Sequence, residues 1–238
     1  MILNKPYLLS KIKRLTPTVS SFVFSPQDNA SIEFSPGMFA MLQFKGEQPG
    51  ETVARAFSMA NCPPSPEFEF LIALVHGKLT SHLENAKTGD LYYISAPYGQ
   101  FKFDFSEKNK FLFLAGGTGL APFISMLRYI KSKGIKADCR LIYSVKYPDE
   151  IINKDELEAF GGSIGLKTTV TVTRPQPGDG WDGEKGHVNA EMIKRDAPDC
   201  TDRISYICGP PAFVKALKDA LISLGVNEKS IKAEMWGE

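Results

Sequence analysis

FLFLAGGTGLAP, residues 111–122, is an apolar run that leads into closely spaced glycines and a proline. The run predicts a buried strand over 111–115, and Pro122 suits the first turn of a helix because the N–H that it lacks is not needed there. Glycines allow positive φ angles and a close approach of a ligand, and a helix N-terminus offers N–H groups to a pyrophosphate. The stretch therefore predicts a strand–turn–helix unit, either as a phosphate site or as a turn with no ligand.

The glycines match the G-x-G-x-x-G pattern of dinucleotide-binding folds only in part. Gly117 and Gly119 occupy two of the glycine positions, with Thr118 between them, and Pro122 occupies the third. Such folds also place an acid about 20 residues further on, at the end of the next strand. That strand is expected to end in Tyr-Ser-Val-Lys at 143–146, which contains no acid. The local pattern alone therefore leaves both interpretations open.

Apolar strands alternate with helical periodicity from this stretch to the end of the chain. After 111–115 we expect strands at 140–145, 167–173, 204–208 and 231–236, and helices at 122–133, 154–160, 189–195 and 212–224. This alternation predicts a parallel sheet that is covered by helices.

The preceding hundred residues show short apolar segments that are separated by glycine and proline turns. The expected strands lie within 7–24, with a break at Thr16-Pro17, and at 39–44, 53–60, 68–75 and 91–95, and one helix is expected at 80–86. This spacing predicts an antiparallel barrel or sandwich. A polar run at 106–110 then predicts a boundary between a domain of residues 1–106 and a domain of residues 107–238.

The composition of the chain excludes several classes of function. Lys and Arg number 28 against 27 Asp and Glu among 238 residues, so no electrostatic footprint for nucleic acid is expected. No apolar run approaches the roughly 18–20 residues of a membrane span, and the first residues do not form a signal peptide. The cysteines, at 62, 139, 200 and 208, lack metal-ligand spacing. We therefore expect no metal site, and a cytoplasmic location because scattered free thiols fit a reducing compartment.

Arg55-Ala56-Phe57-Ser58 places a cation inside an otherwise apolar strand. An arginine that faces a core needs an anion or a carboxylate partner, and an aromatic residue two positions on shares its side of the strand. The group could hold a phosphate and stack a planar ring. Equally, it could be an edge-strand arginine paired with a nearby acid, beside a core phenylalanine.

Two further motifs each have a binding and a structural interpretation. Gly77-Lys78-Leu79-Thr80-Ser81 sets hydroxyls at a helix start, where they could cap the helix or help to bind a second phosphate. Cys208-Gly209-Pro210 follows a buried strand and would lie at the carboxyl edge of the sheet, where open α/β folds bind ligands. The alternative for Cys208 is an ordinary buried free thiol.

Glu234 and Trp236 are two positions apart on the last expected strand, so they would share a face. They could both face a ligand. The alternative is a solvated glutamate and a tryptophan that fills the core.

The order of these motifs, more than any one of them, resembles the ferredoxin–NADP reductase superfamily. RAFS, GKLTSHL, PYGQF, AGGTGLAP, CGPP and the E-x-aromatic end follow one another from about residue 36 onward. The RAFSMAN and CGPP stretches look most like the flavin reductase modules of bacterial multicomponent oxygenases and of the sodium-pumping NADH:quinone reductase subunit. Those proteins usually carry a fused ferredoxin domain that this sequence lacks. The resemblance implies an N-terminal antiparallel β-barrel that binds FAD, followed by a Rossmann-like parallel-sheet domain that binds NAD(P)H.

The resemblance also implies roles for individual residues. Ser58, Cys208 and Glu234 would be catalytic, close to the reacting rings, with Ser58 hydrogen-bonded near flavin N5. The residues implied to bind the cofactors are Arg55, Ala56, Phe57, Ser58, Gly77, Lys78, Leu79, Thr80, Gly117, Thr118, Gly119, Arg174, Cys208, Gly209, Pro210 and Trp236. Thr173-Arg174 is similar to the Ser-Arg pair that holds the 2′-phosphate in NADPH-using members, with Lys146 nearby, but NADH-using members also carry such arginines.

The implied chemistry is hydride transfer from NAD(P)H to FAD and onward electron transfer. The acceptor would be a separate protein, namely a ferredoxin, a flavodoxin or an oxygenase component in a multicomponent redox system. Two alternatives stay open at this point. One is a reductase that uses free flavin as its substrate, and the other is a non-catalytic nucleotide-binding subunit of a larger redox complex.

Overall fold

The computed structural model describes residues 1–28, 31–46, 50–105 and 109–235. The backbone contacts divide the chain into two compact units. One consists of Met1–Phe103 with Ile124–Tyr129, and the other of Asp104–Phe123 with Ile130–Glu238. The boundary expected between residues 106 and 107 lies outside the described residues.

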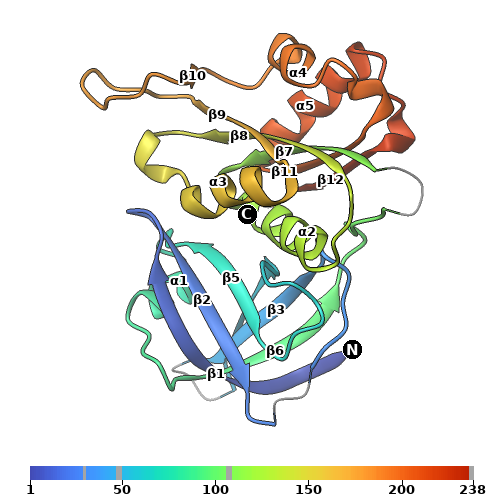
Figure 1. The fold of residues 1–238 in the computed structure, drawn as a ribbon. Coiled ribbons are helices and arrows are strands. Elements are labelled where there is room, and N and C mark those ends of the chain that lie inside the picture. Colours follow the sequence, from blue (N-terminus) through green and yellow to red (C-terminus); the bar gives the residue numbers. More distant parts are fainter. Residues whose placement is uncertain (29–30, 47–49, 106–108, 236–238) are drawn as a thin grey trace. The chain divides into compact units, whose positions relative to one another are not determined.

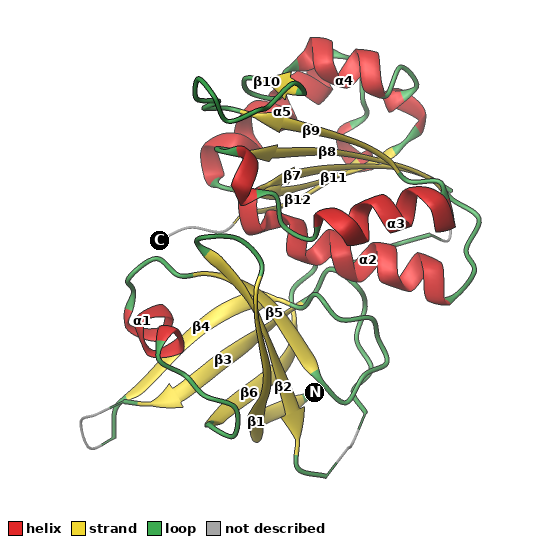
Figure 2. Cartoon of the chain, turned by 60° about the vertical axis from the view of Figure 1, so that its left-hand side comes forward, coloured by secondary structure: helices red, strands yellow, loops and turns green. Residues whose placement is uncertain are grey.

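The first unit is built on an antiparallel sheet of six strands in the order β4-β3-β6-β1-β2-β5, which curls into a half-barrel (Figures 1 and 2). Its elements are β1 (Ile2–Arg14), β2 (Val19–Pro26), β3 (Phe39–Lys45), β4 (Thr52–Ser58), β5 (Phe68–Ala73), α1 (Lys78–Glu84) and β6 (Leu91–Tyr98). Alternate side chains fill the interior, among them Tyr7, Phe24, Phe70 and Tyr92. The prediction of an antiparallel barrel is thus confirmed, and the Thr16-Pro17 break separates β1 from β2 as expected.

The second unit is built on a sheet in the order β10-β9-β8-β7-β11-β12, and its strands run parallel. Its elements are β7 (Lys110–Gly116), the two ends of α2 (Ala121–Ser132), β8 (Asp138–Val145), α3 (Lys154–Ile164), β9 (Lys167–Val172), β10 (Glu184–Lys185), α4 (Ala190–Asp196), β11 (Ile204–Gly209), α5 (Pro211–Ser223) and β12 (Ile231–Met235). Residues 124–129 of α2 belong to the first unit. The chain winds outward from β7 to β10 and then crosses to β11 and β12 on the other side. The strand order therefore reverses between β7 and β11, which is where open α/β sheets bind ligands.

Helices line both faces of this sheet (Figure 2). Phe113 packs against Phe123 of α2 on one face. Leu114 and Ile207 belong to the core on the other face, together with residues of α4 and α5. The predicted parallel sheet with covering helices is confirmed. No helix in the described ranges is long and apolar enough to cross a membrane.

Several elements differ from the sequence predictions. β1 begins at Ile2 rather than at residue 7, and α3 extends to Ile164 rather than to residue 160. A single 3₁₀ turn, Gly117–Leu120, precedes α2, which begins at Ala121 rather than at Pro122. The helix expected from residue 80 begins two residues earlier, at Lys78. The two-residue strand β10 was not predicted, because a strand that short has no periodicity to detect.

A buried arginine ties together the amino ends of three parallel strands. Arg203 is fully buried immediately before β11, and its guanidinium donates to the Asp138 carboxylate (2.6 Å) and the Asp199 carboxylate (2.7 Å). It also donates to the backbone carbonyl of Phe111 on β7. The guanidinium holds the pKa values of Asp138 and Asp199 below their usual range. No local pattern indicates this cluster, because Asp138 is 65 residues from Arg203 along the chain.

Candidate functional site

The predicted residues of the first unit lie on β4 at the end of its sheet. Arg55 and Ala56 are exposed, and Phe57 and Ser58 are half-buried. Phe57 packs against the barrel core, with its ring 6.0 Å from that of Phe70. The expectation that Arg55 faces a core is wrong. Because β4 is the terminal strand of the sheet, the guanidinium reaches solvent and donates to the carbonyl of Ala54 (2.8 Å).

The α1 motif is organised as a helix start. The backbone N–H of Gly77 donates to the Thr80 hydroxyl (2.9 Å), which in turn donates to the Gly77 carbonyl (3.1 Å). Thr80 therefore caps the helix, as one of the two interpretations predicted. Leu79 is a core residue, so only its backbone is available to a ligand. Lys78 pairs with the Glu51 carboxylate at 2.8 Å, and this hydrogen bond raises the pKa of Lys78.

The glycine turn after β7 fits closely against β11. Gly117 has a φ of +55°, which is the left-handed conformation expected of a glycine. Gly119 serves a different purpose. A Cβ atom at this position would lie 2.2 Å from the carbonyl oxygen of Cys208 and 2.9 Å from the backbone nitrogen of Gly209. The absence of a side chain thus lets the turn meet the end of β11 backbone to backbone.

Phe213, in the first turn of α5, is a neighbour that the sequence analysis missed. A Cβ atom on Gly209 would lie 2.7 Å from its ring, and one on Gly116 would lie 3.2 Å from it. Two glycines of the predicted motifs therefore make room for this aromatic ring. No local pattern indicates the contact, because it joins α5 to the ends of β7 and β11.

Cys208 and Glu234 are adjacent in the sheet. They are register partners on β11 and β12, and Cys208 also pairs with Ala115 of β7. Cys208 is almost fully buried, and burial, together with the negative charge of Glu234, raises the pKa of its thiol. Cys208 is therefore a neutral thiol near pH 7, suited to packing against a ring and unsuited to proton exchange. Trp236 lies outside the described residues.

Arg174 and Lys146 follow the neighbouring strands β9 and β8. The backbone N–H of Arg174 donates to the carbonyl of Lys146 (2.9 Å), and both side chains are exposed. The preceding residue, Thr173, is fixed in the same way, because its N–H donates to the carbonyl of Val145 (2.9 Å). Two exposed basic residues are thus backbone neighbours at the carboxyl edge of the sheet.

The predicted residues of the second unit consequently lie along one edge of its sheet. In strand order they are Arg174 after β9, Lys146 after β8, the Gly117–Leu120 turn after β7, Cys208 on β11 and Glu234 on β12. Four strand spacings separate β9 from β12, a span of roughly 19 Å at about 4.8 Å a strand. The edge offers cations at one end, a glycine turn with a helix start at the switch point, and a buried thiol beside a carboxylate at the other end.

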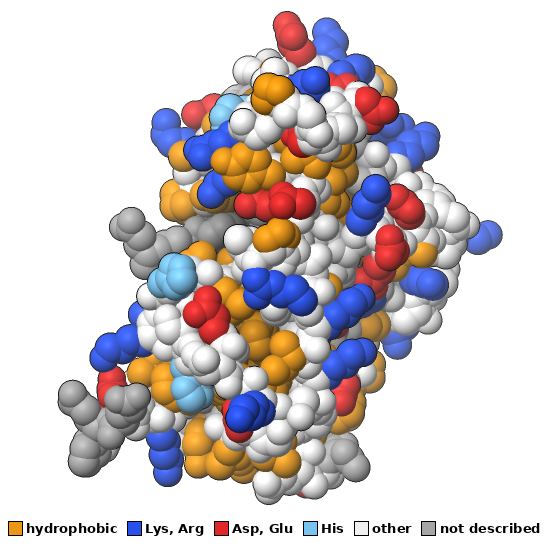
Figure 3. Space-filling view, turned by 90° about the vertical axis from the view of Figure 1, so that its left-hand side faces the viewer, with side chains coloured by type: hydrophobic (Ala, Val, Ile, Leu, Met, Phe, Trp, Pro, Cys, Tyr) orange, Lys and Arg blue, Asp and Glu red, His pale blue; other side chains and the backbone are white. Residues whose placement is uncertain are grey.

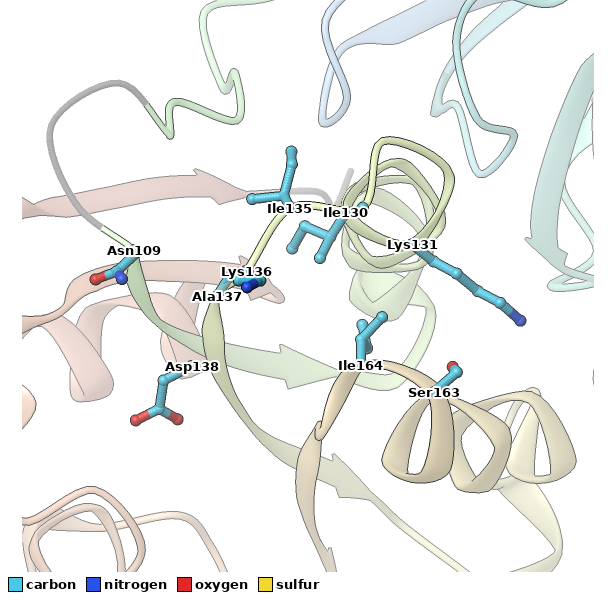
Figure 4. A pocket seen from close by; sticks show the side chains of 10 residues that line it. Asn109, Ile130, Lys131, Ile135, Lys136, Ala137, Asp138, Ser163 and Ile164 are labelled. Atoms are coloured by element: carbon cyan, nitrogen blue, oxygen red, sulfur yellow. The ribbon is translucent and has the colours of Figure 1, made fainter.

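The one cavity described in the second unit is elsewhere. It has a volume of about 630 Å³ and lies near the amino ends of β7 and β8, where Asn109, Lys131, Lys136, Asp138 and Ser163 line it (Figure 4). None of the predicted site residues is among its lining residues. Basic and acidic side chains are interspersed over the face shown in Figure 3, so no field of a single sign marks a site there.

Comparison with known families matches both halves of the chain. The oxidoreductase FAD-binding domain family matches residues 6–103, and the oxidoreductase NAD-binding domain family matches residues 113–219. The glycine betaine monooxygenase reductase subunit of Pseudomonas aeruginosa is 29% identical over 98% of this chain and 65% of its own length. The toluate 1,2-dioxygenase electron transfer component of Pseudomonas putida is 30% identical over 96% of this chain and 66% of its own length. The chain thus spans about two thirds of these relatives.

Solved structures show the same fold. The cytochrome b5 reductase domain of Ulva prolifera nitrate reductase has a TM-score of 0.85 at 25% identity, covering 98% of this chain and 97% of that one. A ferredoxin NADP⁺ reductase from Neisseria gonorrhoeae with bound FAD and NADP has a TM-score of 0.81 at 22% identity, covering 99% of each chain. The fold, the motif order and both domain matches lead to one conclusion: the chain belongs to the ferredoxin–NADP reductase superfamily, with an FAD-binding and an NAD-binding oxidoreductase domain.

Proposed function

We propose that the chain is an FAD-dependent NAD(P)H oxidoreductase that passes electrons to a separate redox protein, such as a ferredoxin, a flavodoxin or an oxygenase component. The observation that carries the proposal is the order of groups along the carboxyl edge of the parallel sheet. Cations, a glycine turn and a buried apolar thiol follow one another as the phosphates and the ring of an extended nicotinamide dinucleotide would require. The reductase and electron-transfer roles of the relatives from oxygenase systems agree with it.

The residues of β4 fit a flavin diphosphate and ring. The exposed guanidinium of Arg55 has several N–H donors with which to bond phosphate oxygens. Phe57 and Ser58 would contact the ring system, and Ala56 adds backbone beside it. At α1, Lys78, Leu79 and Thr80 contribute backbone N–H groups. Gly77 would only border the diphosphate, since its own N–H already donates to the capping hydroxyl of Thr80.

FAD, when bound, supplies the chemistry, since it accepts a hydride and gives up electrons singly or in pairs. The chain's own residues bind and orient. Gly117, Thr118 and Gly119 let the nucleotide approach the backbone, and Gly209 and Pro210 border the same edge. Cys208 would place a neutral thiol beside the nicotinamide at the end of β11, and Glu234 is its register partner on β12. Trp236 is proposed to cover a flavin face.

Ser58→Ala is expected to slow flavin reduction by about 100-fold, the scale of losing one well-placed hydrogen-bond donor. FAD affinity should change far less, because most of it resides in the diphosphate contacts. Stopped-flow absorbance under anaerobic conditions measures the first quantity, and flavin fluorescence measures the second. Ser10→Ala, which removes an exposed hydroxyl bonded to Val23, is the matched control. An unchanged reduction rate in Ser58→Ala would remove the residue from this role.

Arg174→Ala is expected to raise KM for NADPH by about tenfold and to leave KM for NADH nearly unchanged. The reason is that a guanidinium holds a 2′-phosphate, which NADH lacks. Steady-state kinetics with both coenzymes measure the difference, and each coenzyme serves as the control for the other. Equal changes in KM for NADPH and KM for NADH would show that Arg174 does not bind the 2′-phosphate.

The visible spectrum of the purified protein, recorded anaerobically before and after NADPH or NADH, tests the function as a whole. Flavin bands that bleach faster with one coenzyme support the proposal and identify the coenzyme. FAD that dissociates and acts as a substrate would indicate a free-flavin reductase. A protein that binds a nucleotide but shows no NAD(P)H oxidation with added FAD would be a non-catalytic subunit.

We also infer that the protein acts in the cytoplasm. All four cysteines are free thiols, as is usual in a reducing compartment. Cell fractionation with an antibody against the chain tests this inference, and its recovery with an exported fraction would contradict it.

A further inference from the structure

Two side chains of α2 donate hydrogen bonds to the backbone that follows β4. Residues 124–129 of this helix belong to the first compact unit. Ser125 is fully buried, and its hydroxyl donates to the carbonyl of Asn61 at 2.7 Å. Arg128 donates to the carbonyl of Ala60 at 3.0 Å and forms an ion pair with Glu69. Two consecutive carbonyl groups are therefore held by α2.

The same two residues are also hydrogen-bonded to β5 and to Glu67, just before it. The N–H of Ala60 donates to the carbonyl of Glu69 (2.8 Å). The side chain of Asn61 donates to the carbonyl of Glu67 (2.7 Å) and accepts from the N–H of Glu69 (3.1 Å). The Ala60–Asn61 segment is thus hydrogen-bonded both to α2 and to the start of β5, which fixes the direction in which the chain leaves β4.

Packing of α2 against its neighbours does not by itself require the hydrogen bonds of Ser125 and Arg128 to these carbonyls. A serine inside a helix commonly returns its hydroxyl to a carbonyl of its own helix, and an alanine would fill the same buried space. Ser125 instead directs its hydroxyl at a distant backbone carbonyl, 64 residues away in sequence. The charged guanidinium of Arg128 donates to a backbone carbonyl and also forms an ion pair with Glu69. Both interactions converge on the segment that begins two residues after Ser58.

We propose that Ser125 and Arg128 are positioning residues for the flavin-binding strand, because they hold Ala60 and Asn61 and thereby fix the backbone at Ser58. Neither side chain would need to touch the flavin. The inference rests on the proposed function, since it requires that β4 binds FAD. It adds two residues on a helix whose first turn directly follows the glycine turn.

Ser125→Ala and Arg128→Met test the proposal, with FAD binding as the first readout. Each variant is expected to weaken FAD binding by about tenfold, the factor that corresponds to a hydrogen bond of typical net strength. The visible circular dichroism of the bound flavin should also change, because the ring environment at Ser58 shifts. Arg128→Lys, which keeps a cationic donor, should recover part of the affinity. Thermal unfolding of each variant without FAD shows whether it is folded.

Ser21→Ala is the matched control. The Ser21 hydroxyl is buried and donates to the Glu69 carboxylate at 2.7 Å, so it belongs to the same network, but its hydrogen bond does not go to Ala60 or Asn61. It should keep the wild-type affinity and flavin dichroism. If all three variants weaken FAD binding equally, or if Ser125→Ala and Arg128→Met bind FAD with unchanged affinity and dichroism, the proposal is overturned. Failure of the wild-type protein to bind FAD would instead overturn the proposed function.

Discussion

Arg203→Met should lower the free energy of unfolding by about 3 kcal/mol, the low end of the cost of removing one partner from a buried ion pair, because Asp138 and Asp199 are partly exposed. The guanidinium is fully buried, and its loss leaves the carboxylates of Asp138 and Asp199 without their main partner. It also leaves the carbonyl of Phe111 without this donor. Urea unfolding followed by far-ultraviolet circular dichroism measures the change. Arg195→Met, which removes the exposed guanidinium that pairs with Glu184 and Asp196, should cost much less, because solvent screens such pairs.

The same variant should alter the response to acid. Arg203 lowers the pKa values of Asp138 and Asp199 in the folded protein, so these groups add stability above their unfolded pKa of about 3.9. That stability is lost as the pH falls through the lower, folded values. Wild-type stability should therefore drop below about pH 4, and Arg203→Met should show a shallower drop. Identical acid slopes in the two proteins would contradict the assigned cause.

Gly119→Ala should reduce kcat/KM for NAD(P)H by about 100-fold, since misplacement of a binding element by an ångström has effects of this size. The new Cβ atom would lie 2.2 Å from the carbonyl oxygen of Cys208. Both sides of this contact are backbone, so the turn must move away from β11. Overpacking of this kind also costs about 1–3 kcal/mol of stability. Steady-state kinetics and urea unfolding measure the two effects.

Gly162→Ala is the control for this substitution. Gly162 lies within α3, and a Cβ atom there has no neighbour within 4 Å. The variant should keep wild-type kinetics and gain about 0.5–1 kcal/mol, because alanine favours a helix more than glycine does. If Gly119→Ala kept both full activity and full stability, the close approach of the turn to β11 would be refuted.

Local patterns predicted most elements, because their information lies within a few residues. The apolar run 111–115 became β7, Lys110–Gly116, and the periodicity from residue 122 became α2, Ala121–Ser132. The helix near residue 80 was also found, and Thr80 caps it as one interpretation held. The family resemblance supplied what these patterns could not, namely the roles of the motifs.

The features that the sequence did not reveal depend on distant neighbours. Position 119 requires glycine because its backbone lies against that of Cys208, 89 residues later. The sequence indicates only that a glycine can adopt positive φ angles, and it does not indicate this contact. The sequence does not distinguish Arg203 from the exposed arginines, because its partner Asp138 comes close only in the folded chain. Arg55 was expected to face a core, but the pattern of β4 does not say that the strand ends its sheet.

The ion cluster of Arg203 and the residues proposed to bind the coenzyme lie at opposite edges of one parallel sheet. The buried ion cluster is therefore separate from the proposed coenzyme site. The partners of Arg203, namely Asp138, Asp199 and Phe111, all lie outside the carboxyl-edge segments 146–150 and 173–187. We therefore expect coenzyme preference to be an evolvable trait, because substitutions in these segments can alter it while the Arg203 cluster is inherited intact.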